Sequence, residues 1–191
     1  MRRNFRERTK NLSDMTLEEL WQLFPIVLVP HQSRWAEWAQ EEIESLSKIL
    51  SCYSPIITHV GSTAITNIYA KPIIDILVEI PSEADWQHIK MEMEAAGYIH
   101  MSSSAKRMSF NKGYTPDGYA EKVYHIHFHT AGDNNEILFR DYLNNHPTAA
   151  LEYEALKLSL LPRYQNDRDG YTAAKSGFIK KIIAEAQKNI E

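Results

Sequence analysis

The sequence predicts one α+β domain, in which a short mixed β-sheet is flanked by helices and followed by a helical C-terminal part. Three observations predict this class. Strand-like segments gather in the central part of the chain, helical periodicity precedes and interrupts them, and the last third is helical throughout. The 191 residues are enough for a domain with a real core. We expect residues 1–12 to form a flexible basic N-terminal tail and residues 13–191 to form the single domain.

The first two helices are predicted from capping and periodicity. In "SDMTLEELWQLF" the pair Thr16 and Glu19 has the spacing of a capping box. The segment "HQSRWAEWAQEEIESLSKIL" repeats apolar residues at helical spacing, which predicts an amphipathic helix with one apolar stripe. We assign Trp35 and Trp38 to the core, where most tryptophans of such stripes lie.

The sheet is predicted from four short segments. "PIITHV" and "PIIDILVEI" are strand candidates, while "KRMSFNKGY" and "EKVYHIHFHT" alternate and are joined by the turn "TPDG" as a hairpin. A helix, "SEADWQHIKMEMEAAGY", separates the two pairs, with Ser82 as its expected N-cap and Gly97 at its end. Three helices complete the chain, namely "NNEILFRDYLNNH", "PTAALEYEALKLSLL" and "TAAKSGFIKKIIAEAQKNI".

Composition excludes several classes of protein. No stretch approaches ~20 apolar residues, so we expect no membrane span. The net charge of −4 argues against a general nucleic-acid binder, which usually carries a basic face. The single cysteine, Cys52, rules out an intramolecular disulfide and a cysteine-based zinc site, and we expect it to be buried. A cytoplasmic location is the simplest expectation.

The first candidate site lies in "HVGSTAITNIYAKPIIDILVEI". An ionised Asp75 in an apolar strand requires compensation by a metal, a cation or water. The turn at Gly61 and Ser62 offers backbone N–H groups and a hydroxyl that can hold a phosphate. An aspartate beside such a turn is the usual arrangement for a magnesium ion on a nucleotide, whereas the plain alternative is an aspartate hydrogen-bonded to backbone.

Three histidines form the second candidate site. Because His125, His127 and His129 alternate along one strand, all three face the same way. If this strand lies beside that of Asp75, an Asp/His cluster results, which favours Mn, Zn or Fe over Mg. The alternative is a solvated edge whose histidines bond their neighbours.

Several cations could bind an anionic substrate. Lys71 could counter Asp75 or a phosphate, and Arg140 could clamp a phosphate or carboxylate. Lys175 lies one turn from Tyr171 and could form a basic wall with Lys157. The alternatives are a solvated loop lysine, an Arg–Asp pair between helices and a solvated helical face.

Four motifs in this order resemble the GrpB-like family of the polymerase-beta-like nucleotidyltransferase superfamily: "HVGSTAITNIYAKPIIDILVEI", "YHIHFH", "FRDYLNNHP" and "YTAAKSGFI". The resemblance implies the nucleotidyltransferase-type fold, a Gly-Ser turn that binds a nucleoside triphosphate, and an Asp-x-Asp pair plus a third carboxylate that hold two magnesium ions. Gly61 and Ser62 match the turn and Asp75 matches the first aspartate. Leu77 stands at the second position and cannot ligate, and "HIHFH" occupies the region of the third.

Three functions stay open from the sequence. The first is a nucleotidyltransferase-like enzyme that moves a nucleoside monophosphate from a triphosphate to a small acceptor, with Asp75 and His127 as catalytic residues. It would use a divalent metal (Mg, Mn or Zn) held by Asp75, His125 and His127, and would bind its substrate through Gly61, Ser62, Lys71, Arg140 and Lys175. The second is a degenerate module that binds a nucleotide or another small phosphorylated molecule. The third is a metal-dependent enzyme of another class.

Overall fold

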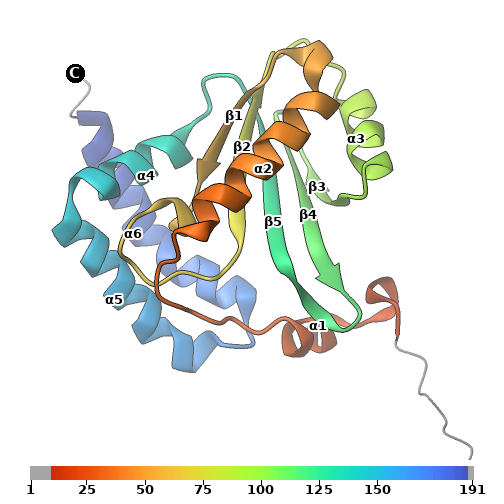
Figure 1. Ribbon diagram of the computed structural model, residues 1–191. Helices are drawn as coiled ribbons and strands as arrows, with labels where there is room; N and C mark the ends of the chain where they lie inside the picture. Colours follow the sequence, from red (N-terminus) through yellow and green to blue (C-terminus); the bar gives the residue numbers. More distant parts are fainter. Residues whose placement is uncertain (1–9, 189–191) are drawn as a thin grey trace, which may run out of the picture.

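The computed structural model describes residues 10–188, a five-stranded mixed sheet with six α-helices (Figure 1). Most of the expected tail, residues 1–12, lies outside the described part. The helices are α1 (Leu17–Leu23), α2 (Arg34–Ile49), α3 (Trp86–Ala95), α4 (Asn135–Asn145), α5 (Pro147–Tyr164) and α6 (Arg168–Lys188). The strands are β1 (Ile56–Val60), β2 (Ile74–Ile80), β3 (Ile99–Ser103), β4 (Arg107–Thr115) and β5 (Gly118–Thr130).

The sheet has the order β1-β2-β5-β4-β3. All neighbouring strands run antiparallel except β2 and β5, which are parallel. This central pair aligns Asp75 with His125 and Leu77 with His127. Since side chains alternate along a strand, the odd-numbered residues of both strands share one face of the sheet.

The main core fills the opposite face. Even-numbered residues of β2 and β5 pack against α2 and α3 in one cluster, which includes Ile76, Ile126, Phe128, Trp35 and Trp38. The core assignment of the two tryptophans is confirmed, with exposed fractions of 0% and 9%. In Figure 1, α2 crosses this face of the sheet.

The C-terminal helices form a second layer. Helices α4, α5 and α6 pack on one another around a smaller apolar cluster that includes Phe139, Leu143, Tyr153 and Ile182. They stand beside the β1 end of the sheet, with α4 in contact with β1 (Figure 1). The α+β fold with a helical C-terminal part is confirmed.

Four details differ from the sequence-based expectation. The edge strand β3 was not expected, because its serine-rich sequence alternates weakly. Helix α3 takes its N-cap from Asp85 and not from Ser82, since the Asp85 carboxylate accepts from the N–H groups of Gln87 and His88. Helix α6 begins at Arg168, ahead of the expected start. Cys52 is exposed and not buried.

Within residues 10–188, none of the helices combines the length and apolar character needed to cross a bilayer.

Candidate functional site

Three side chains from the two central strands meet on the open face of the sheet. His127 Nε2 lies 3.2 Å and His125 Nδ1 lies 3.3 Å from the same oxygen of Asp75, Oδ1. The parallel register places Asp75 beside His125, and the alternation of β5 adds His127 on the same side. The Asp75 and His127 side chains keep exposed fractions of 28% and 36%, so the cluster remains open to solvent.

The three groups set one another's protonation. Burial acts to raise the pKa of Asp75, but hydrogen bonds and positive charge from the two histidines outweigh it and hold the pKa well below its usual range. Burial acts to lower the pKa of His127, but the bond to Asp75 outweighs it and raises that pKa. Burial lowers the pKa of His125. Asp75 is therefore held as an anion by its contacts with the two histidines.

Two groups on its other side also hold His125 neutral. His125 Nε2 lies 2.7 Å from the Tyr114 hydroxyl and 3.0 Å from Arg168 Nη2. A guanidinium only donates, so Nε2 must accept, and the ring proton sits on Nδ1, facing Asp75. Arg168 also donates to the Tyr114 hydroxyl at 2.8 Å.

The Gly-Ser turn lies directly against Asp75. Gly61 has φ +72° and ψ −171°, a backbone conformation that residues other than glycine rarely adopt. A Cβ at this position would fall 2.8 Å from Asp75 Cβ and 2.9 Å from Cγ, closer still to Oδ2. Glycine thus allows the turn to touch the carboxylate, and Ser62 of the same turn lines the adjoining cavity.

This cavity has a volume of about 280 Å³, and cations dominate its charge. Its lining includes Lys71, Lys157, Lys175 and Arg168, and Asp75 is the one acid among the described residues that line it. Lys71 Nζ and Lys175 Nζ lie 5.0 Å and 4.7 Å from the ring centroid of Tyr171. We refer to this space as the cationic cavity.

Burial lowers the pKa values of the three cavity lysines, and nearby positive charges add to this effect for Lys71 and Lys157. Burial, together with the charges of Lys175 and Arg168, lowers the pKa of Lys71 to about 7. Burial and Lys175 also lower the pKa of Lys157 to about 7, although Lys157 donates to the carbonyl of Tyr69. Burial lowers the pKa of Lys175 too. The cavity therefore has more positive groups than its own residues can neutralise.

Arg140 lies outside the cationic cavity. It donates to the carbonyl of His59 at 2.7 Å and bonds its neighbour Asp141, so it ties α4 to β1. The other predicted substrate-binding residues, Gly61, Ser62, Lys71 and Lys175, lie at the cavity or, for Gly61, against Asp75.

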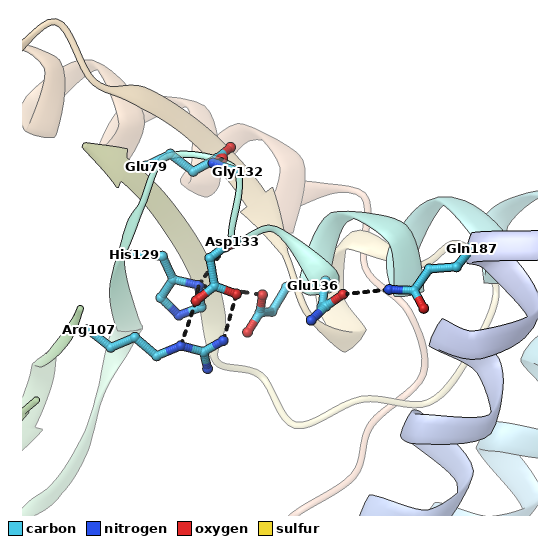
Figure 2. Close-up of polar contacts among 8 residues, drawn as sticks. Glu79, Arg107, His129, Gly132, Asp133, Glu136 and Gln187 are labelled. Atoms are coloured by element: carbon cyan, nitrogen blue, oxygen red, sulfur yellow. Dashed lines mark hydrogen bonds and ion pairs between the residues drawn. The ribbon is translucent and has the colours of Figure 1, made fainter. Parts of the chain in front are cut away.

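His129 belongs to a separate cluster at the far end of β5 (Figure 2). Its Nδ1 donates to the Asp133 carbonyl at 2.8 Å, and Arg107 forms a two-pronged pair with the Asp133 carboxylate at 2.8 Å. Glu79 accepts from the Gly132 N–H at 2.9 Å in the same region. These contacts hold the loop after β5 in place. They explain why His129 and Glu79, which lie on the same face of the sheet as Asp75, do not join its cluster.

The cluster at Asp75 suits one divalent ion. Its three donor atoms lie within 4.8 Å of one another, and the spacings of 3.2 and 3.3 Å match neighbouring ligands of a metal bound at about 2.0–2.2 Å. It does not suit a pair of ions, because Leu77 is fully buried and supplies no oxygen. A metal on His125 Nδ1 would move the ring proton to Nε2. The Tyr114 hydroxyl can accept a hydrogen bond from that N–H, whereas the Arg168 guanidinium cannot.

Sequence reasoning missed Arg168 and Tyr114 as members of the site. Arg168 starts a helix far along the chain and Tyr114 ends β4, and neither carries a motif. Only the folded chain brings both to His125.

Comparison with known proteins supports a family assignment. The family described as "GrpB protein" matches residues 25–185. The glutamate-rich protein GrpB of Alkalihalophilus pseudofirmus is 38% identical over 167 residues, which cover 84% of this chain and 95% of that protein. YqkA, a UPF0157 protein of Bacillus subtilis, is 32% identical over 180 residues and 90% of this chain, but the chain spans only 51% of YqkA.

A solved structure agrees with these matches. The crystal structure of conserved protein GrpB from Enterococcus faecalis has a TM-score of 0.72 and 32% sequence identity, and it covers 86% of this chain and 99% of that chain. The Cid1 poly(U) polymerase in a MgATP-bound structure reaches a TM-score of 0.49 with 13% identity over 74% of this chain and 44% of its own, a likeness too low to carry weight here. From the family match and the identities above 30%, the chain belongs to the GrpB family.

Proposed function

We propose that this protein binds a small phosphate-bearing molecule, such as a nucleotide, in the cationic cavity. The observation that carries the proposal is the convergence of Lys71, Lys157, Lys175 and Arg168 on one space of about 280 Å³. Surface lysines seek water, and a fold gains nothing by crowding them together. An anion with several charged oxygens supplies the missing partner.

The lowered lysine pKa values support the same conclusion. The pKa values of Lys71 and Lys157 are about 7 because burial, and then the charge of Lys175, disfavour their charged forms. A bound phosphate would favour their charged forms and raise both pKa values. The hydroxyl of Ser62, which also lines the cavity, would donate to its oxygens.

Calorimetric titration with pyrophosphate and with ATP tests this proposal. Lys175→Met should weaken binding by about tenfold or more, since a charged hydrogen bond is worth roughly 1.5–3 kcal/mol. Lys180→Met is the matched control, because Lys180 is exposed on the same helix α6 and does not line the cavity. Failure of either anion to bind, or equal losses in both variants, would refute the proposal.

A second candidate is metal-assisted nucleotidyl transfer to a small acceptor. The observation that favours it is the three-donor cluster of Asp75, His125 and His127 next to the cationic cavity. These residues would hold one divalent ion (Mg, Mn or Zn), which would neutralise charge on the phosphate oxygens. With the ion bound, His127 would act as a ligand and not as a base, because its Nε2 lone pair would point to the ion.

Thermal unfolding with ATP, with and without Mn or Zn, separates the candidates. A rise in Tm that needs both metal and ATP, and is lost in Asp75→Asn, supports the transfer enzyme. A rise with ATP that ignores metal supports a binding module without transfer chemistry. A rise with metal that ignores ATP supports a metal-dependent enzyme of another class. Mass spectrometry of the ATP products then decides whether transfer occurs.

A further inference from the structure

A second and larger cavity, of about 590 Å³, lies beside the cationic one. Its walls are α1 and the strands β3 and β4, and its lining includes Leu17, Trp21, Phe24, Ile99 and Met101. Figure 1 shows α1 against the end of the β4–β5 hairpin. We refer to this space as the apolar groove.

The apolar groove gathers several exposed apolar side chains in one concavity. Leu17, Ile99 and Met101 have exposed fractions of 50%, 42% and 54% and all three line it. Scattered exposed apolar residues require no explanation, but a contiguous set within a concavity is typical of a ligand site.

The two cavities share a boundary. His125, His127, Arg168 and Thr172 line both of them. A ligand whose phosphate contacts the cationic side of this boundary would therefore extend its other end into the groove. Asp169 lies on the groove side and opposes a second anionic group there.

Asn111 adds a polar group to the groove. It is 8% exposed and lines the groove. Its carboxamide can serve a donor and an acceptor at once. With Trp21 nearby, this combination matches a flat aromatic ring that has polar edge atoms.

We infer that the apolar groove holds the aromatic part of the same ligand whose phosphate occupies the cationic cavity. The ligand is then an aromatic or heteroaromatic phosphate ester that crosses the boundary between the two cavities at His125 and His127. This inference rests on the proposed phosphate binding and adds the chemistry of the rest of the ligand. It predicts that a simple phosphate uses only half of the available contacts.

Three probes test the inference by calorimetry on the full chain: methyl phosphate, 1-naphthyl phosphate and 1-naphthol. Naphthyl phosphate should bind at least about tenfold more tightly than methyl phosphate, which corresponds to roughly 60 Å² of additional apolar surface removed from water. Leu17→Gln with Met101→Gln should remove this gain and leave methyl phosphate binding within about twofold of the parent.

A matched control is available on the same protein. Met91→Gln with Leu151→Gln changes residues of similar exposure, 53% and 56%, that do not line the groove, and should leave all three affinities unchanged. The four replaced side chains are all exposed, so folding should survive in both double variants.

The outcomes are distinguishable. Equal affinities for methyl and naphthyl phosphate would overturn the inference and leave the proposed phosphate binding intact. Binding of 1-naphthol as tight as that of naphthyl phosphate would also overturn it, because the groove would then serve a separate apolar molecule. If methyl phosphate, naphthyl phosphate and pyrophosphate all fail to bind, the proposed function itself fails.

Discussion

Gly61→Ala offers the sharpest test of the geometry at Asp75. Alanine at φ +72° and ψ −171° is strained, at a cost of about 1–3 kcal/mol. In addition its Cβ would fall 2.8 Å from Asp75 Cβ and 2.9 Å from Cγ, so the turn or the carboxylate must shift. Overpacking of this kind costs about 1–3 kcal/mol more. We expect a total loss of about 2–6 kcal/mol in the free energy of unfolding.

Two further glycines calibrate this number. Gly97 has φ +88° and open space around its Cβ position, so Gly97→Ala isolates the backbone strain at about 1 kcal/mol. Gly177 lies in helix α6 with open space, and Gly177→Ala should stabilise by about 0.5–1 kcal/mol.

Urea denaturation measures all three variants, and a thermal scan should show Gly61→Ala melting lower by about 4–24 °C, taking about 2–4 °C per kcal/mol. The same variant should lose affinity for Mn, because Asp75 moves away from its histidines. If Gly61→Ala and Gly97→Ala agree within about 0.5 kcal/mol, the contact between the turn and Asp75 is not what the structure indicates.

The other predictions concern charge and burial in the same region. The pKa values of Lys71 and Lys157 are about 7 in the folded protein, so both lysines are mostly neutral at pH 8 and mostly charged at pH 6. Pyrophosphate should therefore bind with uptake of more than one proton by the protein at pH 8 and of few at pH 6. Calorimetry in buffers of different ionisation enthalpy counts these protons, and equal uptake at both pH values would contradict the assignment. Since these pKa values lie below the ordinary 10.5, the two lysines should make the ligand-free protein more stable as the pH rises from about 7 toward 10.5, which urea denaturation at several pH values checks. Tyr114→Phe removes a hydrogen bond to the neutral ring of His125 and should raise the pKa of that histidine by about half a unit, measured by NMR titration; a lower pKa would mean that the ring donates to the tyrosine. Leu77→Asp should destabilise the fold by about 3 kcal/mol or more in urea, and a loss under 1 kcal/mol would show the position open to water.

Local sequence was sufficient for the α-helices, for the strands other than β3, and for part of the site. Periodicity along each segment reports which face is apolar, and this information needs no distant contact. Thr16 with Glu19 marked the start of α1, and "TPDG" marked the β4–β5 turn, both as the structure has them. Asp75 stood out because a charge in an apolar strand has few explanations other than a site or a buried hydrogen bond.

The spacing of the histidines predicted their common face but not their separate fates. His125 and His127 meet Asp75, while His129 turns to the loop at Asp133. The difference arises from the distance along β5. His125 pairs with Asp75, and at about 3.3 Å per residue His129, four positions further on, lies beyond the reach of the same carboxylate.

What the sequence by itself determined is therefore the elements other than β3, the face of each expected strand and the chemical groups available: an aspartate, a glycine turn, imidazoles and lysines. Tertiary structure alone decided that β2 lies parallel to β5 in the register that joins Asp75 to His125, and that Arg168 enters the cavity while Arg140 stays outside it. The physical reason is that periodicity and capping are short-range properties of the chain, whereas strand order and helix docking depend on how distant apolar surfaces are buried together.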